Sequence, residues 1–362
     1  MRQKFYSLKG ILSKNAQYNV IFGERSNGKT YAVLKYGIEQ FAAQGAQMAI
    51  VRRWQTDFTG KRGATMFDAL VANGEISKIT NNEWSGVYYY GSRWYFCRYD
   101  DKGERIVDEF PFAYGFAISS MEHDKSTSYP KIRTILFDEF ISRNAYLPDE
   151  FVLFANTISM IIRQREDVRI FMLGNTVNQY CPYFDEMGLK HIKQMKEGDI
   201  DVYTYGDSNL LVAVEYCRPN KKGKSSDVYF AFDNPKLSMI TGGAWEIDIY
   251  PHCPVKYKPN EVIFNYFIVF SGDVLHCEIV QHEDVSFTFI HAKTTPLDYD
   301  RDYIFTTEYS PRPNVRRNIT KPRTRIDKKI VEYFMSDKVF YSTNQVGEIV
   351  RNYLIWCGKN MK

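Results

Sequence analysis

The chain has 362 residues, of which 25% are charged and 16% are aromatic, and its formal net charge is +4. This length is too great for one ordinary hydrophobic core and fits two domains. The sequence contains neither a secretion-signal pattern nor an apolar run as long as a membrane helix, so we expect a soluble, intracellular protein that does not enter a membrane. The 6 cysteines are scattered without a C-x-x-C pair, which favours a reducing compartment.

A phosphate-binding loop follows the first strand expected in the chain. The apolar residues 18–22 predict this strand, and residues 23–30 match the complete pattern G-x-x-x-x-G-K-[ST]. Its two glycines let successive N–H groups face phosphate oxygens. Its lysine would reach the β- and γ-phosphates of a nucleotide, and its threonine would ligate Mg²⁺. The alternative is a surface turn that happens to contain glycine. The expected nucleotide-binding residues are Gly23, Glu24, Arg25, Ser26, Asn27, Gly28, Lys29 and Thr30.

Strands and helices alternate through the first half of the chain. The expected elements are a helix at 31–38, a strand at 47–51, a hairpin at 86–99 that turns at 91–92, and a strand at 112–118. Alternation of this kind implies a mostly parallel sheet covered by helices on both faces, which is an α/β fold.

Two carboxylates follow the strand expected at 132–137. Asp138 would lie at the carboxyl end of this buried strand and hold Mg²⁺, and Glu139 would polarise the attacking water. Taken alone, two acids after a strand are also typical of a solvated strand end. Together with the phosphate loop they predict an ATPase site. A glutamate beside the magnesium aspartate is typical of hydrolases that do mechanical work.

A polar segment follows the next strand, expected at 168–173. Asn175 would lie beside the nucleotide, where it senses the γ-phosphate or positions the water, and Thr176 and Asn178 are further candidates. The alternative is a polar turn.

Phosphoryl transfer also needs positive charge against the transition state. Arg163, Arg165 and Arg169 lie between the helix expected at 149–162 and the strand that follows it, and Lys125 is a fourth candidate. Considered alone, each of these is more typical of a surface cation.

The second half of the chain is rich in predicted strands. The polar, basic residues 221–226 predict a linker. Three strand candidates, at 262–270, 274–280 and 285–291, predict an antiparallel meander. A basic stretch at 312–329 and an amphipathic helix at 345–356 follow.

Two adjacent pairs, His252 with Cys253 and His276 with Cys277, resemble parts of a zinc site. Neighbouring residues on a strand point to opposite faces, so we do not expect either pair to bind a metal.

Basic residues suited to contacts with a nucleic-acid backbone fall in three regions. They are Arg52 and Arg53 with Lys61 and Arg62, the lysines of 221–224, and the stretch 312–329. A solvated loop is the alternative for each region.

The order of these motifs resembles that of the DNA-packaging ATPases, or DNA encapsidation proteins, of small tailed phages of the phi29 type. The matching landmarks are residues 22–32, 51–53, 125–130, 137–141, 163–169 and 175–184. They span the N-terminal half in order, whereas the C-terminal half resembles the family only in pattern and length.

The resemblance implies an additional-strand (ASCE) P-loop ATPase domain at 1–200, a linker domain at 201–230 and an RNase H-like α+β domain at 231–362. In this family the last domain has lost its nuclease carboxylates. Here Asn265 lies in the first strand of the meander, where an active nuclease has an aspartate, so DNA cleavage by a two-metal mechanism is not expected.

The resemblance also implies a homomeric ring, expected to be a pentamer, that docks at the portal of an empty procapsid in the host cytoplasm. It would use ATP and Mg²⁺ to drive double-stranded DNA inward. Small phages of this type also use a structural RNA at the motor. Arg163 aligns with an arginine finger that acts in trans, Lys125 with a second cation that reaches the neighbour's nucleotide, and the loop around Lys61 with a contact to DNA phosphates.

Two other classes of function remain open from the residues. An active terminase-like ATPase and nuclease would require a carboxylate cluster in the C-terminal domain. A non-motor P-loop NTPase, such as a signalling or partition protein, would use that domain as an interaction module.

Overall fold

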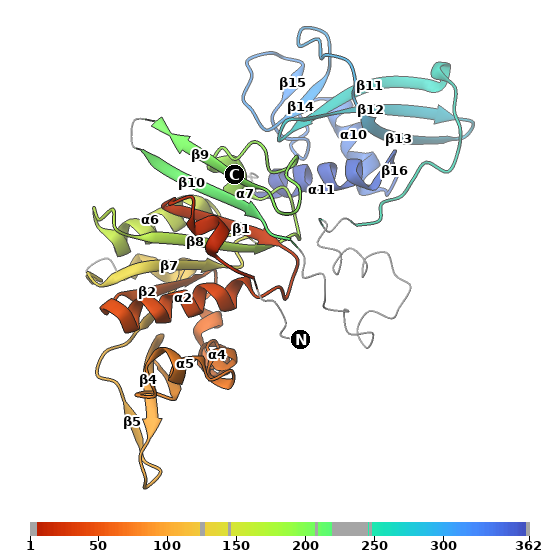
Figure 1. The fold of residues 1–362 in the computed structure, drawn as a ribbon. Helices are drawn as coiled ribbons and strands as arrows, with labels where there is room; N and C mark the ends of the chain where they lie inside the picture. Colours follow the sequence, from red (N-terminus) through yellow and green to blue (C-terminus); the bar gives the residue numbers. More distant parts are fainter. Residues whose placement is uncertain are drawn as a thin grey trace. The chain divides into compact units, whose positions relative to one another are not determined.

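The computed structural model describes residues 6–123, 127–143, 146–206, 209–218, 245 and 248–359. The chain divides into two compact units, Met1–Glu246 and Ile247–Lys362 (Figure 1). Among the described residues, no helix combines the length and the apolar character needed to cross a bilayer.

The first unit is built on a 10-stranded sheet in the order β3-β4-β6-β2-β7-β8-β1-β10-β9, with β5 paired to β4. The central strands from β6 to β10 run parallel, so the expected mostly parallel α/β sheet is confirmed. The strands are β1 Tyr18–Gly23, β2 Gln47–Arg52, β3 Gly86–Tyr90, β4 Arg93–Tyr99, β5 Arg105–Val107, β6 Ala113–Ala117, β7 Ile132–Asp138, β8 Arg169–Asn175, β9 Ile200–Tyr205 and β10 Leu210–Tyr216.

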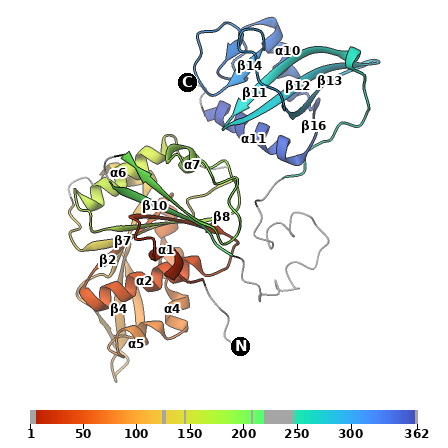
Figure 2. The same cartoon turned by 45° about the horizontal axis from the view of Figure 1, so that its top comes forward.

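Two long helices cover opposite faces of this sheet, as Figure 2 shows for α2 (Lys29–Gln44) and α6 (Glu150–Ile162). Alternate residues of each strand supply the two cores, because successive side chains of a strand point to opposite faces. In β1, Ile21 packs in the core that contains α2, whereas Val20 and Phe22 pack in the core that contains α6. The shorter helices are α1 Lys9–Leu12, η1 Gln55–Phe58, α3 Gly60–Ala64, α4 Asp68–Ala72, α5 Glu75–Ile79, η2 Ile118–His123 and α7 Pro182–Glu186.

The strand β8 lies between β1, which leads into the phosphate loop, and β7, which ends in the carboxylates. Its pairing with both neighbours is parallel and in register along its length. The carboxyl ends of all three strands therefore meet at one edge of the sheet, where ligands of open α/β sheets bind.

The sheet continues beyond residue 200, where the family resemblance implied a linker domain. β10 pairs with β1 in parallel, and β9 pairs with β10 in antiparallel fashion. Residues 200–205 and 210–216 therefore belong to the first sheet, because they extend it at the edge beside the phosphate-loop strand. The predicted linker at 221–226 lies outside the described residues.

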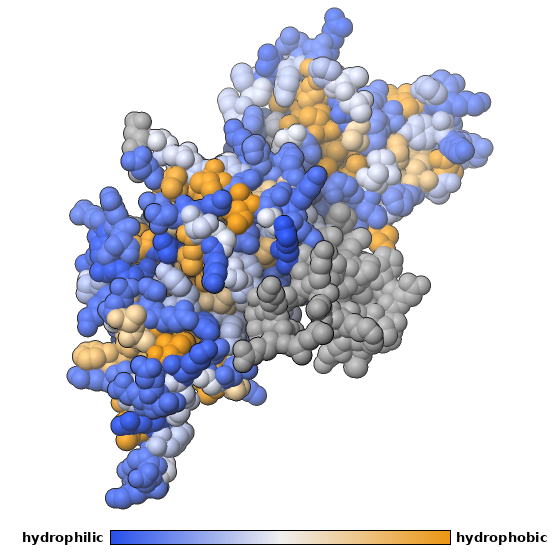
Figure 3. All heavy atoms as spheres, in the orientation of Figure 1, coloured by the Kyte–Doolittle hydropathy of each residue, from blue (hydrophilic) through white to orange (hydrophobic). Residues whose placement is uncertain are grey.

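The expected hairpin is present as β3 and β4, and a second turn leads from β4 into β5. This second hairpin extends away from the body of the first unit (Figure 1). Hydrophilic side chains cover its tip on the face shown in Figure 3. The three short helices α3, α4 and α5 precede the hairpin, and the sequence patterns did not predict them.

The second unit contains a 6-stranded sheet in the order β15-β14-β11-β12-β13-β16. The expected meander is present, since β11 pairs with β12 and β12 with β13 in antiparallel fashion, while β14 runs parallel to β11. Helix α11 (Asn344–Lys359) contacts β11, β13 and β16. The remaining elements are η4 Pro259–Glu261, β11 Val262–Phe270, β12 Asp273–His282, β13 Val285–Ala292, β14 Ile304–Thr306, β15 Val315–Arg316, α10 Arg325–Met335 and β16 Val339–Tyr341.

Candidate nucleotide-binding site

The loop that joins β1 to α2 depends on its two glycines. Gly28 caps the helix with φ 92°, a left-handed conformation that side chains with a Cβ disfavour. Gly23 lies against the end of β10, where an added Cβ would be 2.5 Å from the Cys217 Sγ. Helix α2 begins at Lys29, so its positive N-terminal dipole lies directly behind the loop. This combination of loop and helix start favours an anion such as a phosphate group.

Lys29 is buried, with 6% of its surface exposed. Its Nζ donates to the Glu24 carbonyl at 2.7 Å and to the Asn175 Oδ1 at 3.3 Å. Burial lowers the pKa of Lys29, although the nearby charges of Cys217 and Asp138 act in the opposite direction. The ammonium group therefore lies between the loop and the end of β8, where a phosphate would need a cation.

Thr30 and Asp138 lie side by side at the start of α2 and the end of β7. The Thr30 hydroxyl donates to the Asp138 Oδ1 at 3.2 Å. Burial raises the pKa of Asp138, and the Arg52 guanidinium acts to lower it. Hydroxyl and carboxylate oxygens are the hard ligands that Mg²⁺ prefers. This pair therefore fits the magnesium site that the sequence predicted.

Arg52 joins the two predicted carboxylates. Its guanidinium nitrogens lie 2.7 Å from an oxygen of Asp138 and 2.7 Å from an oxygen of Glu139. The pairing of β2 with β7 explains this contact, because Val51 lies in register with Phe137. Glu139 has a positive φ of 61°, which is unusual for a residue with a side chain, and its side chain is 66% exposed. Glu139, the candidate for the general base, thus has a strained backbone conformation, and its carboxylate is paired with Arg52.

These side chains surround a cavity of about 260 Å³. Its lining residues are Ser26, Asn27, Gly28, Lys29, Thr30, Tyr31, Asp138, Glu139, Leu173, Gly174 and Asn175. Asn175 reaches the cavity because it ends β8 in register with Gly23. Gly23, Glu24 and Arg25 belong to the loop but not to this lining. The structure therefore gathers most of the predicted nucleotide, magnesium and catalytic residues of the first unit in one place.

Arg163 lies at the C-terminal end of α6 and does not line the cavity. It follows the last residue of α6 and donates to the Thr127 carbonyl, in the segment that precedes β7. Lys125, the second predicted cation, lies outside the described residues.

The other two arginines of this segment, Arg165 and Arg169, form hydrogen bonds within the first unit. Arg165 donates to the carbonyls of Ile132 and Ile161 at 2.7 and 3.0 Å, and it thereby ties the end of α6 to β7. Arg169 donates to the Tyr36 hydroxyl at 3.2 Å. Both arginines therefore have partners within the first unit, and neither of them lines the cavity.

Arg53 does not present its guanidinium to a nucleic acid, contrary to the expectation from the sequence. Its side chain is 8% exposed and pairs with the buried Glu150, with an Nε to Oε2 distance of 2.7 Å. It also donates to the Phe140 carbonyl at 2.9 Å, and Tyr183 donates to the same glutamate. The pair fastens β2 to the start of α6. Lys61, by contrast, is exposed on α3, as a contact with DNA phosphates would require.

Sequence reasoning missed two members of the site. Arg52 was considered only as a possible DNA contact, because its position beside Asp138 depends on the strand order. Cys217 was not considered, but its Sγ accepts a hydrogen bond from Asn27 at 3.0 Å and helps to fix the phosphate loop against β10. No local sequence signal marks either residue.

Comparison with known protein families finds a match to the N-terminal part of the chain. Residues 1–204 match the family described as podovirus DNA encapsidation protein (Gp16). The chain is 30% identical over 186 residues to the DNA packaging protein of Bacillus phage phi29, an alignment that covers 50% of this chain and 49% of that protein. The matched region therefore spans about half the length of this curated relative.

Two solved structures resemble the whole chain in fold. The phi29 viral genome packaging motor assembly matches with a TM-score of 0.55 and 21% identity, covering 99% of both chains. The Phi-28 gp11 DNA packaging motor matches with a TM-score of 0.52 and 19% identity, covering 100% of this chain and 99% of that one. At these identities the likeness concerns the fold alone.

Proposed function

The chain belongs to the podovirus DNA encapsidation protein (Gp16) family, and from this premise we propose that it hydrolyses ATP to move double-stranded DNA into a procapsid. The observation that carries the proposal is the cavity at the carboxyl edge of the first sheet. It combines a phosphate loop, a buried lysine, a hydroxyl–carboxylate pair and a second carboxylate, which are the parts that phosphoryl transfer requires.

ATP and Mg²⁺ fit the residues of this cavity. The loop N–H groups and Lys29 would bind the phosphates, and Thr30 and Asp138 would hold the metal, whose charge would stabilise the transferring phosphoryl group. Two features support this fit. Gly28 adopts the left-handed conformation of such loops, and the Thr30 hydroxyl already lies 3.2 Å from the Asp138 carboxylate.

Glu139 would act as the general base that orients and deprotonates the attacking water. Its side chain is exposed at the cavity, so it is accessible to water, while Arg52 holds its carboxylate. Asn175, which contacts Lys29, would sense the γ-phosphate end of the nucleotide.

Arg163 would complete the cavity of a neighbouring subunit in trans, together with Lys125. Helix α6 has 13 residues, which corresponds to about 20 Å, and it starts near the cavity and ends at Ile162, directly before Arg163. Glu150 at its start binds Arg53, the residue after Arg52. The length of this helix separates Arg163 from its own cavity, as a role in trans within the expected homomeric ring, a pentamer, would require.

We propose that the second unit is an RNase H-like domain that has lost its nuclease function. Its strand order, an antiparallel meander with a parallel strand beside the first strand, supports this assignment. Among the described residues, the one cluster of three His, Cys, Asp or Glu side chains at ligand distance is His276, Glu278 and His291, so that part of the chain holds no carboxylate triad. Asn265 lies on β11, the first strand of the meander, where an active nuclease has an aspartate, and this residue favours a motor over a terminase-like nuclease.

The partners that follow from this function are double-stranded DNA and the portal of an empty procapsid, in the host cytoplasm. The curated relative named as a DNA packaging protein supports DNA as a partner. A structural RNA is a separate question, which a binding assay with the phage's own small RNAs would answer.

The decisive experiment measures ATP hydrolysis by the purified full-length chain with and without double-stranded DNA, while a gel follows the length of the DNA. We expect stimulation by intact DNA and no shortening of it. Lys29→Ala should abolish turnover. Lys35→Ala is the matched control, because Lys35 lies on the same helix but pairs with Glu75. Shortened DNA would indicate a nuclease, and hydrolysis indifferent to DNA would indicate a non-motor NTPase.

A further inference from the structure

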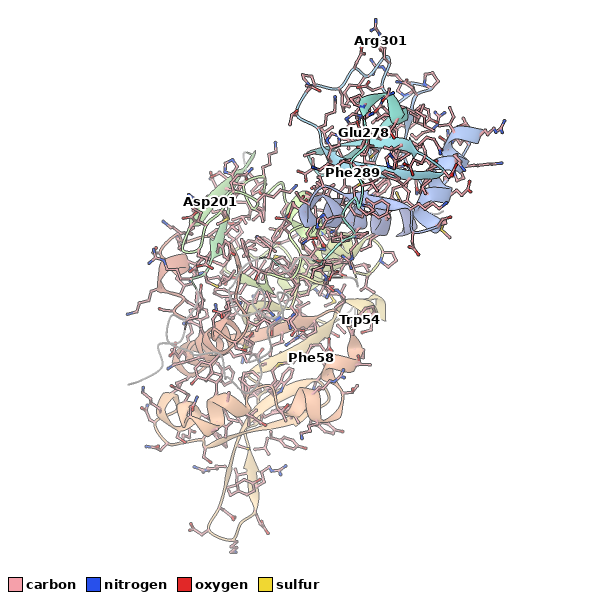
Figure 4. The ribbon with its side chains drawn as sticks, turned by 90° about the vertical axis from the view of Figure 1, so that its right-hand side faces the viewer. Trp54, Phe58, Asp201, Glu278, Phe289 and Arg301 are labelled. Carbon is pink, nitrogen blue, oxygen red and sulfur yellow. The ribbon has the colours of Figure 1, made fainter. Side chains whose placement is uncertain are left out.

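One face of the second sheet carries a cluster of imidazole and carboxylate side chains. His276 on β12 lies directly opposite His291 on β13, and Glu278 follows two residues after His276 on β12. Residues two apart on a strand share a face, so all three side chains project from the same side. Figure 4 shows Glu278 and Phe289, which are paired on the neighbouring strands β12 and β13.

The three side chains are close enough to share one ion. One possible ligand atom from each residue lies within 4.8 Å of the others. The His291 Nε2 is 3.8 Å from the Glu278 Oε2, and the centroids of the two imidazole rings are 4.8 Å apart. A zinc ion with ligands at about 2.0–2.2 Å needs ligand atoms closer than this. Small rotations of the partly exposed side chains would close the difference.

Hydrogen bonds to neighbouring groups orient all three side chains. The His291 Nδ1 lies 3.0 Å from the Ala292 carbonyl, so an N–H at Nδ1 can donate there and leave Nε2, on the side of Glu278, to bind a metal. The Tyr257 hydroxyl donates to the Glu278 carboxylate, and the His276 Nε2 is 2.8 Å from the Asn265 Oδ1. Metal-binding histidines generally donate their second ring N–H to such a partner, which fixes the tautomer.

We propose that His276, Glu278 and His291 form a zinc-binding site on the sheet of the second unit. Two imidazole nitrogens and one carboxylate oxygen are a ligand set for zinc or a similar transition-metal ion, whereas Mg²⁺ and Ca²⁺ take oxygen ligands. The Glu278 and His291 side chains are 20% and 32% exposed, so a fourth coordination position is open to water. This site belongs to a different unit from the nucleotide cavity and does not depend on ATP hydrolysis.

The ligands of this proposed site differ from the adjacent pair, His276 with Cys277, that resembled part of a zinc site in the sequence. His276 and Cys277 are adjacent, but Cys277 is fully buried on the opposite face of β12. The second histidine comes instead from the neighbouring strand, and the carboxylate from two residues along. The side chains of adjacent residues on β12 therefore point to opposite faces, as expected, and the pairing of β12 with β13 brings the proposed ligands together.

The test is a titration of the metal-free, full-length protein with Zn²⁺ by calorimetry, repeated with Co²⁺ to record its visible absorption spectrum. We expect one zinc ion per chain and a rise in melting temperature on binding. His291→Ala and Glu278→Gln should each weaken binding about tenfold or more. His282→Ala is the matched control, because His282 lies on the same strand but pairs with Glu261, outside the cluster.

Three outcomes would overturn the proposal: no zinc binding, equal binding by the wild type and both cluster variants, or binding that Cys253→Ser abolishes while the cluster variants keep it. Melting curves of the metal-free variants establish that each is folded. If His291→Ala does not fold, Glu278→Gln decides the question, because a glutamine preserves the size of the side chain and removes only its charge.

Discussion

The Arg52 guanidinium lies 2.7 Å from the Glu139 carboxylate. The same guanidinium also contacts the buried Asp138, so one cation from β2 serves both acids at the end of β7. In the proposed mechanism, Glu139 would therefore begin the reaction with its charge paired. It would have to exchange this ion pair for a water molecule before acting as a general base, so we propose Arg52 as a control point for hydrolysis.

Replacing Glu139 by glutamine should leave ATP binding intact and slow hydrolysis by about 100-fold or more, since a positioned base contributes roughly 10²–10⁴ to the rate. The amide keeps the shape of the side chain but cannot accept the proton. Binding is measured with a fluorescent ATP analogue and turnover by phosphate release. Glu186→Gln, at an exposed glutamate of α7, is the control. Turnover at the wild-type rate would remove Glu139 from the mechanism.

Mixing two inactive variants tests whether Arg163 acts in trans. Arg163→Ala has an intact cavity, and Lys29→Ala has an intact Arg163. In mixed rings some cavities should face an intact arginine, so part of the DNA-stimulated ATPase activity should return. The activity is measured across mixing ratios, with each variant alone as the baseline. Absence of rescue in rings shown to be mixed counts against the role of Arg163.

Replacing Arg53 by alanine should lower the free energy of unfolding by about 3–5 kcal/mol, because it leaves a buried carboxylate without its cation. The Glu150 side chain is only 1% exposed. Urea denaturation of the nucleotide-free chain measures the change. Arg62→Ala is a matched control, since its pair with Asp57 is long, at 3.8 Å, and the arginine is 71% exposed. The control should change stability by less than about 1 kcal/mol.

Asp327→Asn should destabilise the second unit by about 1–3 kcal/mol at neutral pH. The carboxylate accepts from the backbone N–H groups of Arg323 and Thr324, both at 2.8 Å. Burial acts to raise the pKa of Asp327, but these bonds and one from Tyr303 outweigh it and lower the pKa.

The sign of the pH dependence follows from that lowered pKa. The stabilisation by Asp327 is present above the unfolded value of about 3.9 and is lost as the pH falls through the folded value. The difference between wild type and Asp327→Asn should therefore shrink in denaturation series below about pH 4. Asp300→Asn, at a carboxylate that is 83% exposed, is the control. A difference that stays constant with pH would contradict the assignment.

The parts of the site that depend on local sequence were predictable. The phosphate loop is a continuous pattern, and Asp138 and Glu139 end a strand whose apolar residues are evident. Strands β11 to β13 were predictable for the same reason, since each is a long run of β-formers between polar turns.

The parts that depend on strand order or on short elements were not predictable. Arg52 contacts the carboxylates only because β2 pairs with β7, and no spacing along the chain encodes that pairing. Helices α3 to α5 have 5 residues each, too few to show a helical period. Helix α10 does carry a local signal, the capping box of Thr324 and Asp327, which the surrounding cations obscured.

Helix α6 gives the proposed ring a mechanical property. Its first residue is clamped through Arg53 to the strand that carries Arg52, and its last residue precedes Arg163. Because the helix is continuous between these residues, a displacement at the clamp would reach the arginine in the proposed ring. Lengthening the helix by one turn would then shift Arg163 relative to the neighbouring subunit while leaving the contacts within each cavity unchanged.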